Sequence, residues 1–332
     1  MFGLVPERTN TRTRKKLSLM EYRYQLAKKG KWICPQCQHK TFVLYVDADN
    51  QPLNENVGKC DRADNCAYHY TPHEYFTDNG IPDEQRPKRP AIKPIIQIQP
   101  SFIDAAILKA TLKQYSENRF ATYLHRLFGK EDAAILIHDY FVGSSNHWPG
   151  STVFWQIDRN GHIRAGKIML YDTDTGKRVK QPFNHISWVH TVLKLDNYNL
   201  VQCLFGEHLL RNRPGDTVVI VESEKTAIIG AGFATDAVWL ATGGCQNLST
   251  KICQPLAGRN VLLMPDNGKF EDWAKRGRDL MSFCKSVYIS DIMEQRAAQK
   301  GDDIGDLFTE YYLNGTLNQS VFDNTTVHRL RN

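Results

Sequence analysis

The second half of the chain alternates short apolar runs with segments of helical periodicity. The predicted strands lie near residues 217–222, 236–241, 260–265 and 286–290. The predicted helices lie near residues 224–231, 271–284 and 292–299. Alternation of this kind is typical of a parallel sheet covered by helices. Two runs, TVVIVESEK and NVLLMPDNG, are apolar until their last few positions, as expected of strands that are buried on both faces.

The first half of the chain shows other periods. Apolar residues recur at helical spacing in segments 101–115, 118–129 and 131–141. Ser101 is the predicted N-cap of the first helix, with Asp104 at its N3 position, and Gly129 is the predicted end of the second. From residue 150 the segments STVFWQID, HIRAGKIMLYD and KRVKQPF read as short strands, and Asn160-Gly161 predicts a hairpin turn between the first two.

These patterns predict an α/β protein made of several parts. Five prolines among charged residues predict an extended linker at 77–100. The predicted order is a basic arm (1–29), a zinc ribbon (30–76), the linker (77–100), a helical and mixed α/β region (101–212), a parallel-sheet domain flanked by helices (213–310) and a tail (311–332). The arm is either a solvated tail or a segment that touches phosphates.

Four cysteines in the N-terminal part have the spacing of a zinc ribbon. Cys34 and Cys37 form a C-x2-C pair, and Cys60 and Cys66 form a looser second pair 22 residues further on. Four thiolates close the coordination shell of Zn²⁺, so the predicted zinc is structural. Because the second pair is loose, His39 or His69 remains an alternative ligand. The aromatic and basic residues nearby suit either a small core or contact with single-stranded nucleic acid.

Composition and charge add little to this picture. Hydrophobic residues make up 41% and charged residues 23% of the chain, and the formal net charge is +6. A mildly basic chain fits a nucleic-acid partner but does not require one. The sequence contains no secretory signal and no apolar stretch long enough to span a bilayer, so we expect a cytoplasmic protein without membrane association. In the cytoplasm, cysteines are more often metal ligands or buried thiols than disulfides.

Three acidic clusters carry the candidate chemistry. Glu222 and Glu224 follow the first apolar run, Asp266 follows another, and a third cluster, GDDIGD, contains Asp302 and Asp303. Carboxylates at the ends of parallel strands converge at one edge of a sheet, where they can hold Mg²⁺. The alternative for the first cluster is acidic charge at a helix N-terminus, and the alternative for Asp303 is a helix cap.

The order of these parts resembles bacterial and plasmid primases that contain a Toprim domain. VESEK at 221–225 resembles the V-E-G motif of that family, Asp266 stands where its D-x-D motif opens, and residues 301–306 resemble its third acidic segment. The segment DRNGHIRAGKIMLYD and residues 204–210 are similar to the family's strand pair and to the helix before its first acidic motif. The whole chain is most similar to Toprim-like, zinc-ribbon proteins of bacterial mobile elements.

The resemblance implies synthesis of RNA primers on single-stranded DNA by nucleotidyl transfer that depends on Mg²⁺ or Mn²⁺. Glu222 would act through one ion on a 3′-hydroxyl or water, and Asp266 with Asp302 or Asp303 would hold a second ion. The residues expected to neutralise nucleotide phosphates are Lys225, Arg164, Lys167, Arg178 and Lys180. The implied partners are the DNA template, nucleotides and a helicase or another replication or mobilisation protein.

The sequence also departs from the family pattern. Gly268 replaces the second acid of D-x-D, Ser223 replaces the glycine after the first glutamate, and Thr226 replaces an aspartate. A site with fewer carboxylates binds divalent ions more weakly, although Glu224, Asp272 or Asp302 are candidates to compensate. Two alternatives therefore stay open: a DNA-binding accessory without catalytic activity, and a nuclease.

Overall fold

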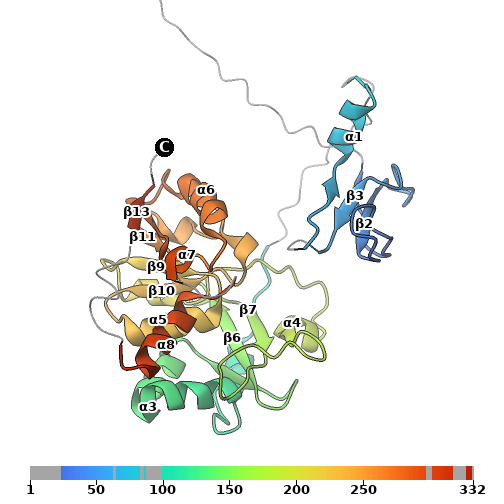
Figure 1. Cartoon of the computed structure of the whole chain (residues 1–332). Coiled ribbons are helices and arrows are strands. Elements are labelled where there is room, and N and C mark those ends of the chain that lie inside the picture. The colour runs from blue at the N-terminus through green and yellow to red at the C-terminus, as the bar shows by residue number, and fades with distance from the viewer. Residues whose placement is uncertain are drawn as a thin grey trace, which may run out of the picture. The chain divides into compact units, whose positions relative to one another are not determined.

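The structure is a computed structural model that describes residues 24–62, 65–82, 86, 99–296, 301–316 and 327–330. Contacts divide the chain into two compact units, residues 1–97 and residues 98–332 (Figure 1). Most of the predicted basic arm, most of the predicted linker and about half of the predicted tail lie outside the described residues. Among the described helices, none is long and apolar enough to cross a membrane.

The first unit is a small antiparallel sheet with one helix. Its four strands follow chain order: β1 (Gln25–Leu26), β2 (Phe42–Val46), β3 (Gly58–Cys60) and β4 (His69–Tyr70). Helix α1 (Pro72–Asp78) begins at a capping box. β2 and β3 form an antiparallel pair between the two cysteine pairs, which is the arrangement of a zinc ribbon. Phe42, Leu44 and Val46 of β2 pack against Cys34 and Cys60, so the core of this unit surrounds two of the cysteines.

The second unit begins with helices and an antiparallel sheet. Its first elements are α2 (Ala105–Thr111), α3 (Arg119–Asp139), β5 (Gly143–Ser145), β6 (Ser151–Ile157), β7 (Ile163–Met169), β8 (Ile186–Trp188) and α4 (Val189–Val192). Helix α3 contains the predicted second and third helices, which join across a kink at Gly129. β6 and β7 form the predicted hairpin, and Gly161 in its turn has a φ of 88°.

The helix predicted over residues 101–115 is shorter than expected. Asp104, rather than Ser101, is its N-cap, because the Asp104 carboxylate accepts a hydrogen bond from the backbone N–H of Ala106 at 2.7 Å. Ser101 is held instead by Asn199, whose backbone N–H donates to the Ser101 hydroxyl. A side-chain N-cap is therefore present, as predicted, but it lies at Asp104 and not at Ser101.

The strand predicted for the segment KRVKQPF is wrong. Among the described residues, a single bridge between Tyr171 and Arg178 is its only pairing, and Pro182 has no N–H to donate to a ladder. The strand that pairs with β7 is β8, which begins after this segment. The segment therefore forms an extended loop beside the sheet.

The C-terminal sheet contains five strands in the order β10–β9–β11–β12–β13. Their bounds are β9 (Val218–Val221), β10 (Val238–Ala241), β11 (Asn260–Leu263), β12 (Ser286–Ser290) and β13 (Val327–Arg329). The first four are parallel, as predicted, and β13 is antiparallel to β12. After β9 the chain forms β10 on one side and then returns to form β11 on the other. β9 and β11 therefore flank a topological switch point, where α/β sheets open a crevice at the carboxyl ends of their strands.

Helices cover both faces of this sheet (Figure 1). They are α5 (Glu224–Phe233), α6 (Phe270–Leu280), α7 (Ile292–Arg296) and α8 (Ile304–Leu313). Val219 and Trp239 face a core shared with α3, α5, α7 and α8, whereas Ile220 and Leu263 face a second core shared with α6. The predicted doubly covered sheet is confirmed. The last residues of the helix predicted over 292–299 lie outside the described part of the chain.

Candidate functional site

The four cysteines of the ribbon lie together. All four sulfurs are within 4.8 Å of one another, with 3.7 Å between the sulfurs of Cys34 and Cys66 and 3.9 Å between those of Cys37 and Cys60. A tetrahedron of thiolates with zinc–sulfur bonds of about 2.3 Å has edges of about 3.8 Å, so this donor set fits Zn²⁺. A backbone hydrogen bond at His39 lowers the pKa of Cys37 to about 6, which favours the metal-binding thiolate near neutral pH.

Neither alternative ligand belongs to this group. The imidazole of His69 stacks on Tyr45 and lies 3.0 Å from its hydroxyl, and the imidazole of His39 contacts the backbone oxygen of Cys37. Two turns present the cysteines: one runs from Cys34 to His39, and the other brings the N–H of Cys66 onto the carbonyl of Arg62. The sequence therefore identifies the complete tetrahedral set.

We expect Cys34→Ser to lower the zinc content and to unfold the first unit alone. The apolar core of this unit is small, and domains of this size depend on such a metal for stability. Limited proteolysis should cut the variant within residues 24–82 and leave the second unit intact, whereas Cys245→Ser, outside the ribbon, should retain one zinc per chain. A Cys34→Ser variant with full zinc content and unchanged proteolysis would contradict the assignment.

Glu222 and Asp266 meet at the switch point of the C-terminal sheet. Glu222 directly follows β9, and the register that pairs Leu263 with Ile220 places Asp266 just beyond the same edge. The two carboxyl groups share a hydrogen bond, and the backbone N–H of Cys245 also donates to Glu222. The predicted convergence of the first two acidic clusters is therefore present in the structure.

This edge carries an excess of acidic charge. Burial, followed by the charges of Glu222 and Asp303, raises the pKa of Asp266 to about 9, and burial raises the pKa of Glu222 as well. A pKa this high means that Asp266 keeps its proton at neutral pH when no cation is bound. Two carboxylates are a sufficient protein ligand set for Mg²⁺, which keeps waters and substrate phosphates as its other ligands.

The raised pKa of Asp266 predicts that, without divalent ions, stability of the second unit falls with rising pH. The folded state keeps a proton up to about pH 9 that the unfolded chain loses near its ordinary pKa of 3.8, so stability declines between these values. The slope is at most about 1.4 kcal/mol per pH unit. Urea unfolding of zinc-loaded protein, followed by tryptophan fluorescence, should show this decline. Asp266→Asn should reduce it, and identical pH profiles for the two proteins would refute the prediction.

The third acidic cluster reaches the same edge through backbone contacts. The N–H of Asn267 donates to the carbonyl of Asp302 at 3.0 Å, and the N–H of Gly301 donates to the carbonyl of Asn267 at 3.3 Å. Asp303 is the N-cap of α8 and forms a capping box with Asp306, which is the alternative that the sequence left open. Asp303 also contributes to the raised pKa of Asp266, so it lies within electrostatic reach of that residue.

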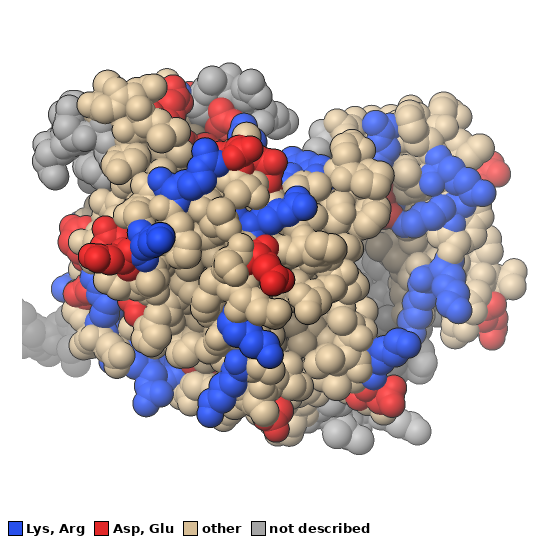
Figure 2. Space-filling model, turned by 90° about the horizontal axis from the view of Figure 1, so that it is seen from below, with Lys and Arg blue, Asp and Glu red and all other residues tan. Residues whose placement is uncertain are grey.

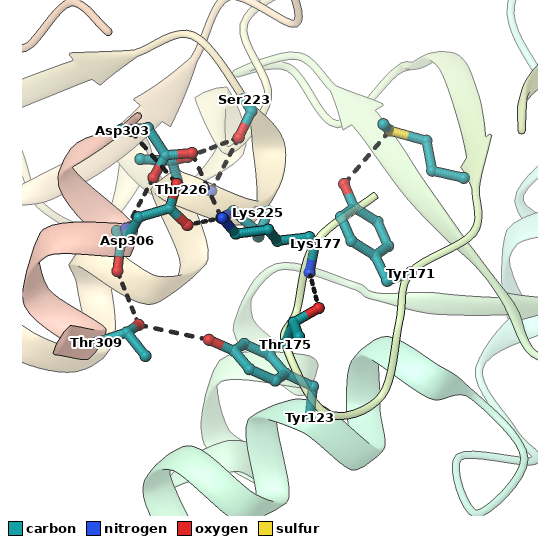
Figure 3. A network of polar contacts seen from close by, with 12 residues as sticks. Tyr123, Tyr171, Thr175, Lys177, Ser223, Lys225, Thr226, Asp303, Asp306 and Thr309 are labelled. Atoms are coloured by element: carbon teal, nitrogen blue, oxygen red, sulfur yellow. Dashed lines mark hydrogen bonds and ion pairs between the residues drawn. The ribbon is translucent and has the colours of Figure 1, made fainter. Parts of the chain in front are cut away.

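Lys225 extends from the first turn of α5 to this capping box (Figure 3). Its amine lies 2.7 Å from Oδ1 of Asp306 and 3.4 Å from Oδ2 of Asp303. Burial opposes the charge of Lys225, but the two carboxylates outweigh this effect and raise the pKa of the amine. Lys225 is therefore a buried internal cation. This pairing has no local signal in the sequence, although the D-x-x-D spacing of the cap can be seen in it.

Lys167 is engaged in a second buried ion pair. Its amine, on β7, lies 3.1 and 3.2 Å from the two carboxylate oxygens of Glu224 and donates to the carbonyl of Gly243 at 2.9 Å. Glu224 is fully buried, and the amide of Gln156 beside this cluster is also buried, with no partner for either of its polar atoms among the described residues. This cluster joins the antiparallel sheet to the first residue of α5, two positions after Glu222. Sequence reasoning did not single out Gln156.

The basic residues expected to bind phosphates are not brought together. Lys167 and Arg164 are three positions apart on β7, so they point to opposite faces of its sheet. Arg164 donates to Asp158 at 2.7 Å and lies over the ring of Phe102. Arg178 is half-buried and Lys180 is exposed, both on the loop before β8. A role for these residues on nucleotide phosphates remains a prediction.

The departures from the family pattern have local explanations. Ser223 is the N-cap of α5, and its hydroxyl accepts a hydrogen bond from the backbone N–H of Thr226 at 3.1 Å. Gly268 is a turn residue with a φ of 81°, and its N–H donates to Glu294 at 2.8 Å. Asp272, a candidate to compensate for the lost acid, is paired with Arg276 at 3.0 Å.

Two family models match the chain. Residues 22–81 match a zinc β-ribbon finger family, and residues 118–267 match a family described as a domain of unknown function, DUF6371. The first match confirms the predicted ribbon and, with the four clustered cysteines, supports a structural zinc. A comparison with curated proteins found no match.

Solved primases are among the structures similar to this chain. The primase fragment of the bacteriophage T7 primase-helicase protein is 13% identical, and the match covers 90% of this chain and 99% of that one with a TM-score of 0.38. The RNA polymerase domain of Mycobacterium tuberculosis DnaG primase is 13% identical, with coverage of 67% and 82% and a TM-score of 0.43. A DnaG primase catalytic domain bound to ssDNA is 10% identical, with a TM-score of 0.35, and the match covers 61% of this chain and only 62% of that one.

Proposed function

We propose that this protein synthesises short RNA primers on single-stranded DNA, with the edge formed by Glu222 and Asp266 as its catalytic centre. The observation that carries the proposal is the meeting of two half-buried carboxylates, linked by a hydrogen bond, at the switch point between β9 and β11. Sheets of α/β proteins bind ligands in the crevice at such a point. Two adjacent carboxylates repel each other, and a bound cation would relieve this repulsion.

The donor set suits a hard divalent cation held by Glu222 and Asp266. When bound, Mg²⁺ or Mn²⁺ neutralises phosphate charge and favours ionisation of a hydroxyl. In the proposed reaction the 3′-oxygen of one nucleotide bonds to the α-phosphorus of the next, the bond to pyrophosphate breaks, and the hydroxyl proton passes to solvent. The Lys167–Glu224 pair contributes by fixing the start of α5, and with it the position of Glu222.

A groove beside the acidic edge is the proposed path of the template. Two cavities of about 590 and 450 Å³ share lining residues and form one groove. The shared residues are Val201, Gln202, Lys251 and Ile252. Gln246 and Asn247, which line the larger cavity, directly follow Cys245, whose N–H donates to Glu222. We therefore place this end of the groove near the acidic edge. Lys251 and Trp188 offer it a positive charge and an aromatic face, which are the features that bind single strands.

The zinc ribbon offers a second surface for single-stranded DNA. Trp32 and Ile33, next to the first cysteine pair, are 40% and 62% exposed. Figure 2 shows several Lys and Arg side chains on the surface of this unit. Those exposed among the described residues include Lys28, Lys29, Lys31, Lys40 and Lys59. An exposed aromatic ring among lysines suits base stacking and phosphate contact. The resemblance to mobile-element proteins extends the proposal to the replication of such an element, with a helicase or mobilisation protein as a partner.

A second candidate function rests on Gly268. The carboxylate that the primase pattern places there is absent, and the loop carries a glycine turn instead. If one missing ligand is enough to abolish activity, the chain is a DNA-binding accessory that retains the fold of the site without its reaction.

The test is an assay of zinc-loaded, full-length protein with single-stranded DNA, labelled NTPs and Mg²⁺ or Mn²⁺. We expect short, alkali-labile oligonucleotides whose formation requires both template and divalent ion. Template binding without product would support the accessory function. Shortening of the template would support the nuclease alternative, and either result would overturn the primase proposal.

A further inference from the structure

Each of the four carboxylate oxygens of Asp303 and Asp306 has a hydrogen-bond donor or an ion-pair partner. Oδ1 of Asp303 accepts the backbone N–H of Asp306 at 3.0 Å, and Oδ2 of Asp306 accepts the backbone N–H of Asp303 at 3.5 Å. The remaining two oxygens face the amine of Lys225 at 3.4 and 2.7 Å. Figure 3 shows these groups converging between α5 and α8. The pair is therefore already neutralised in part, by a cation that belongs to the chain.

The Lys225 ammonium is enclosed by its surroundings. The Lys225 side chain is 9% exposed, and those of Asp303 and Asp306 are 11% and 30% exposed. On the far side, the hydroxyl of Thr309 donates to the carbonyl of Gly305 at 2.8 Å and lies 3.4 Å from the hydroxyl of Tyr123, which fixes the first turn of α8 (Figure 3). An ammonium held in this way is a permanent part of the site, unlike an exchangeable ion.

Glu222 and Asp266 are in a different situation. They share a hydrogen bond with each other, and no lysine or arginine forms an ion pair with either of them among the described residues. The acidic edge is thus divided into one pair of carboxylates with a resident cation and one pair without. The charges of Lys269 and Lys167 act on Glu222 without an ion-pair contact. Among the described residues, the second pair is therefore the one that a divalent ion can neutralise, and two carboxylates plus substrate phosphates suffice for one Mg²⁺.

We propose that this centre binds a single divalent cation, at Glu222 and Asp266, and that the Lys225 ammonium permanently takes the place of a second. This inference rests on the proposed function only in placing a divalent ion at the acidic edge. It replaces the two-ion arrangement that the sequence resemblance implies. It also explains why the site can have Gly268 where the family has a second acid. A site with one exchangeable ion needs fewer carboxylates than a site with two.

The test counts bound Mn²⁺ by electron paramagnetic resonance in zinc-loaded, full-length protein. We expect one Mn²⁺ per chain for the wild type, lost in Asp266→Asn. Lys225→Met frees Asp303 and Asp306 and should double the count to two, whereas Lys225→Arg, which keeps the charge, should leave it at one. Lys275→Met, an exposed lysine on α6, is the matched control and should also remain at one.

Two bound ions in the wild type would overturn the proposal without any variant, so it remains testable even if Lys225→Met fails to fold. A well-folded Lys225→Met protein that still binds one ion would also overturn it. The count of bound Mn²⁺ is independent of primer synthesis. The expected counts without any product would support this inference and refute the proposed reaction. Primer synthesis with two ions bound to the wild type would support the reaction and refute this inference.

Discussion

Primer synthesis is expected to fall by about a thousandfold or more in Glu222→Gln and in Asp266→Asn, a loss of about 4 kcal/mol in transition-state stabilisation. Each substitution removes one of the two carboxylates that meet at the switch point and leaves an amide of the same size. The remaining single carboxylate holds a divalent ion weakly, so the reaction loses its neutralising charge. Steady-state primer yield at saturating NTP and Mg²⁺ measures the effect.

The matched control for these variants is Asp279→Asn, which makes the same chemical change at an exposed position of α6. It should retain wild-type yield. At pH 8 without divalent ions, Asp266→Asn should also be at least as stable as the wild type, because it removes a buried acid that is costly to ionise. Loss of activity without loss of stability would show that Glu222 and Asp266 act in the reaction and not in folding. Full activity in both variants would refute their assignment as the catalytic centre.

Lys167→Ala is expected to destabilise the second unit by about 3–5 kcal/mol, the usual cost of removing one partner of a buried ion pair. Glu224 would be left fully buried without its cation, next to the buried amide of Gln156 and the carbonyl of Gly243. Unfolding in urea, followed by the buried tryptophans of this unit, measures the loss. Primer synthesis should also fall, because Glu224 begins the helix that positions Glu222.

Lys177→Ala, an exposed lysine shortly after β7, is the control and should change stability by less than about 0.5 kcal/mol. The double variant Lys167→Met, Glu224→Leu should recover most of the lost stability, since a buried pair can be replaced by apolar side chains of similar size at little cost. Equal stability of Lys167→Ala and the wild type would show that Glu224 is not held by this pair.

The sequence was sufficient to predict the features that depend on local pattern. Cys34, Cys37, Cys60 and Cys66 were identifiable because ligand spacing in a knuckle is a local property. The convergence of Glu222 with Asp266 was also predictable, since apolar runs indicate parallel strands and their carboxyl ends lie at one edge. Domain boundaries and the catalytic roles of these residues stay predictions.

The roles of the lysines could not be predicted from local pattern. Lys167 pairs with Glu224, which lies 57 residues away in the sequence, and Lys225 pairs with Asp306, which lies 81 residues away. Such pairings depend on how two sheets and their helices pack, and they leave no local pattern in the sequence. Without a visible partner, both lysines were expected to contact phosphates. The strand predicted for KRVKQPF failed for a related reason: its composition suits a strand, but no neighbouring strand pairs with it beyond one bridge.

The most direct test of the central claim, that Glu222 and Asp266 form a divalent-cation site, is anomalous diffraction from crystals of the zinc-loaded protein grown with Mn²⁺. Zinc at the four cysteines provides an internal reference peak. We predict one further peak, in contact with the carboxylates of Glu222 and Asp266, and none beside Asp303 and Asp306. A map with a clear zinc peak and no peak at Glu222 and Asp266 would contradict the account.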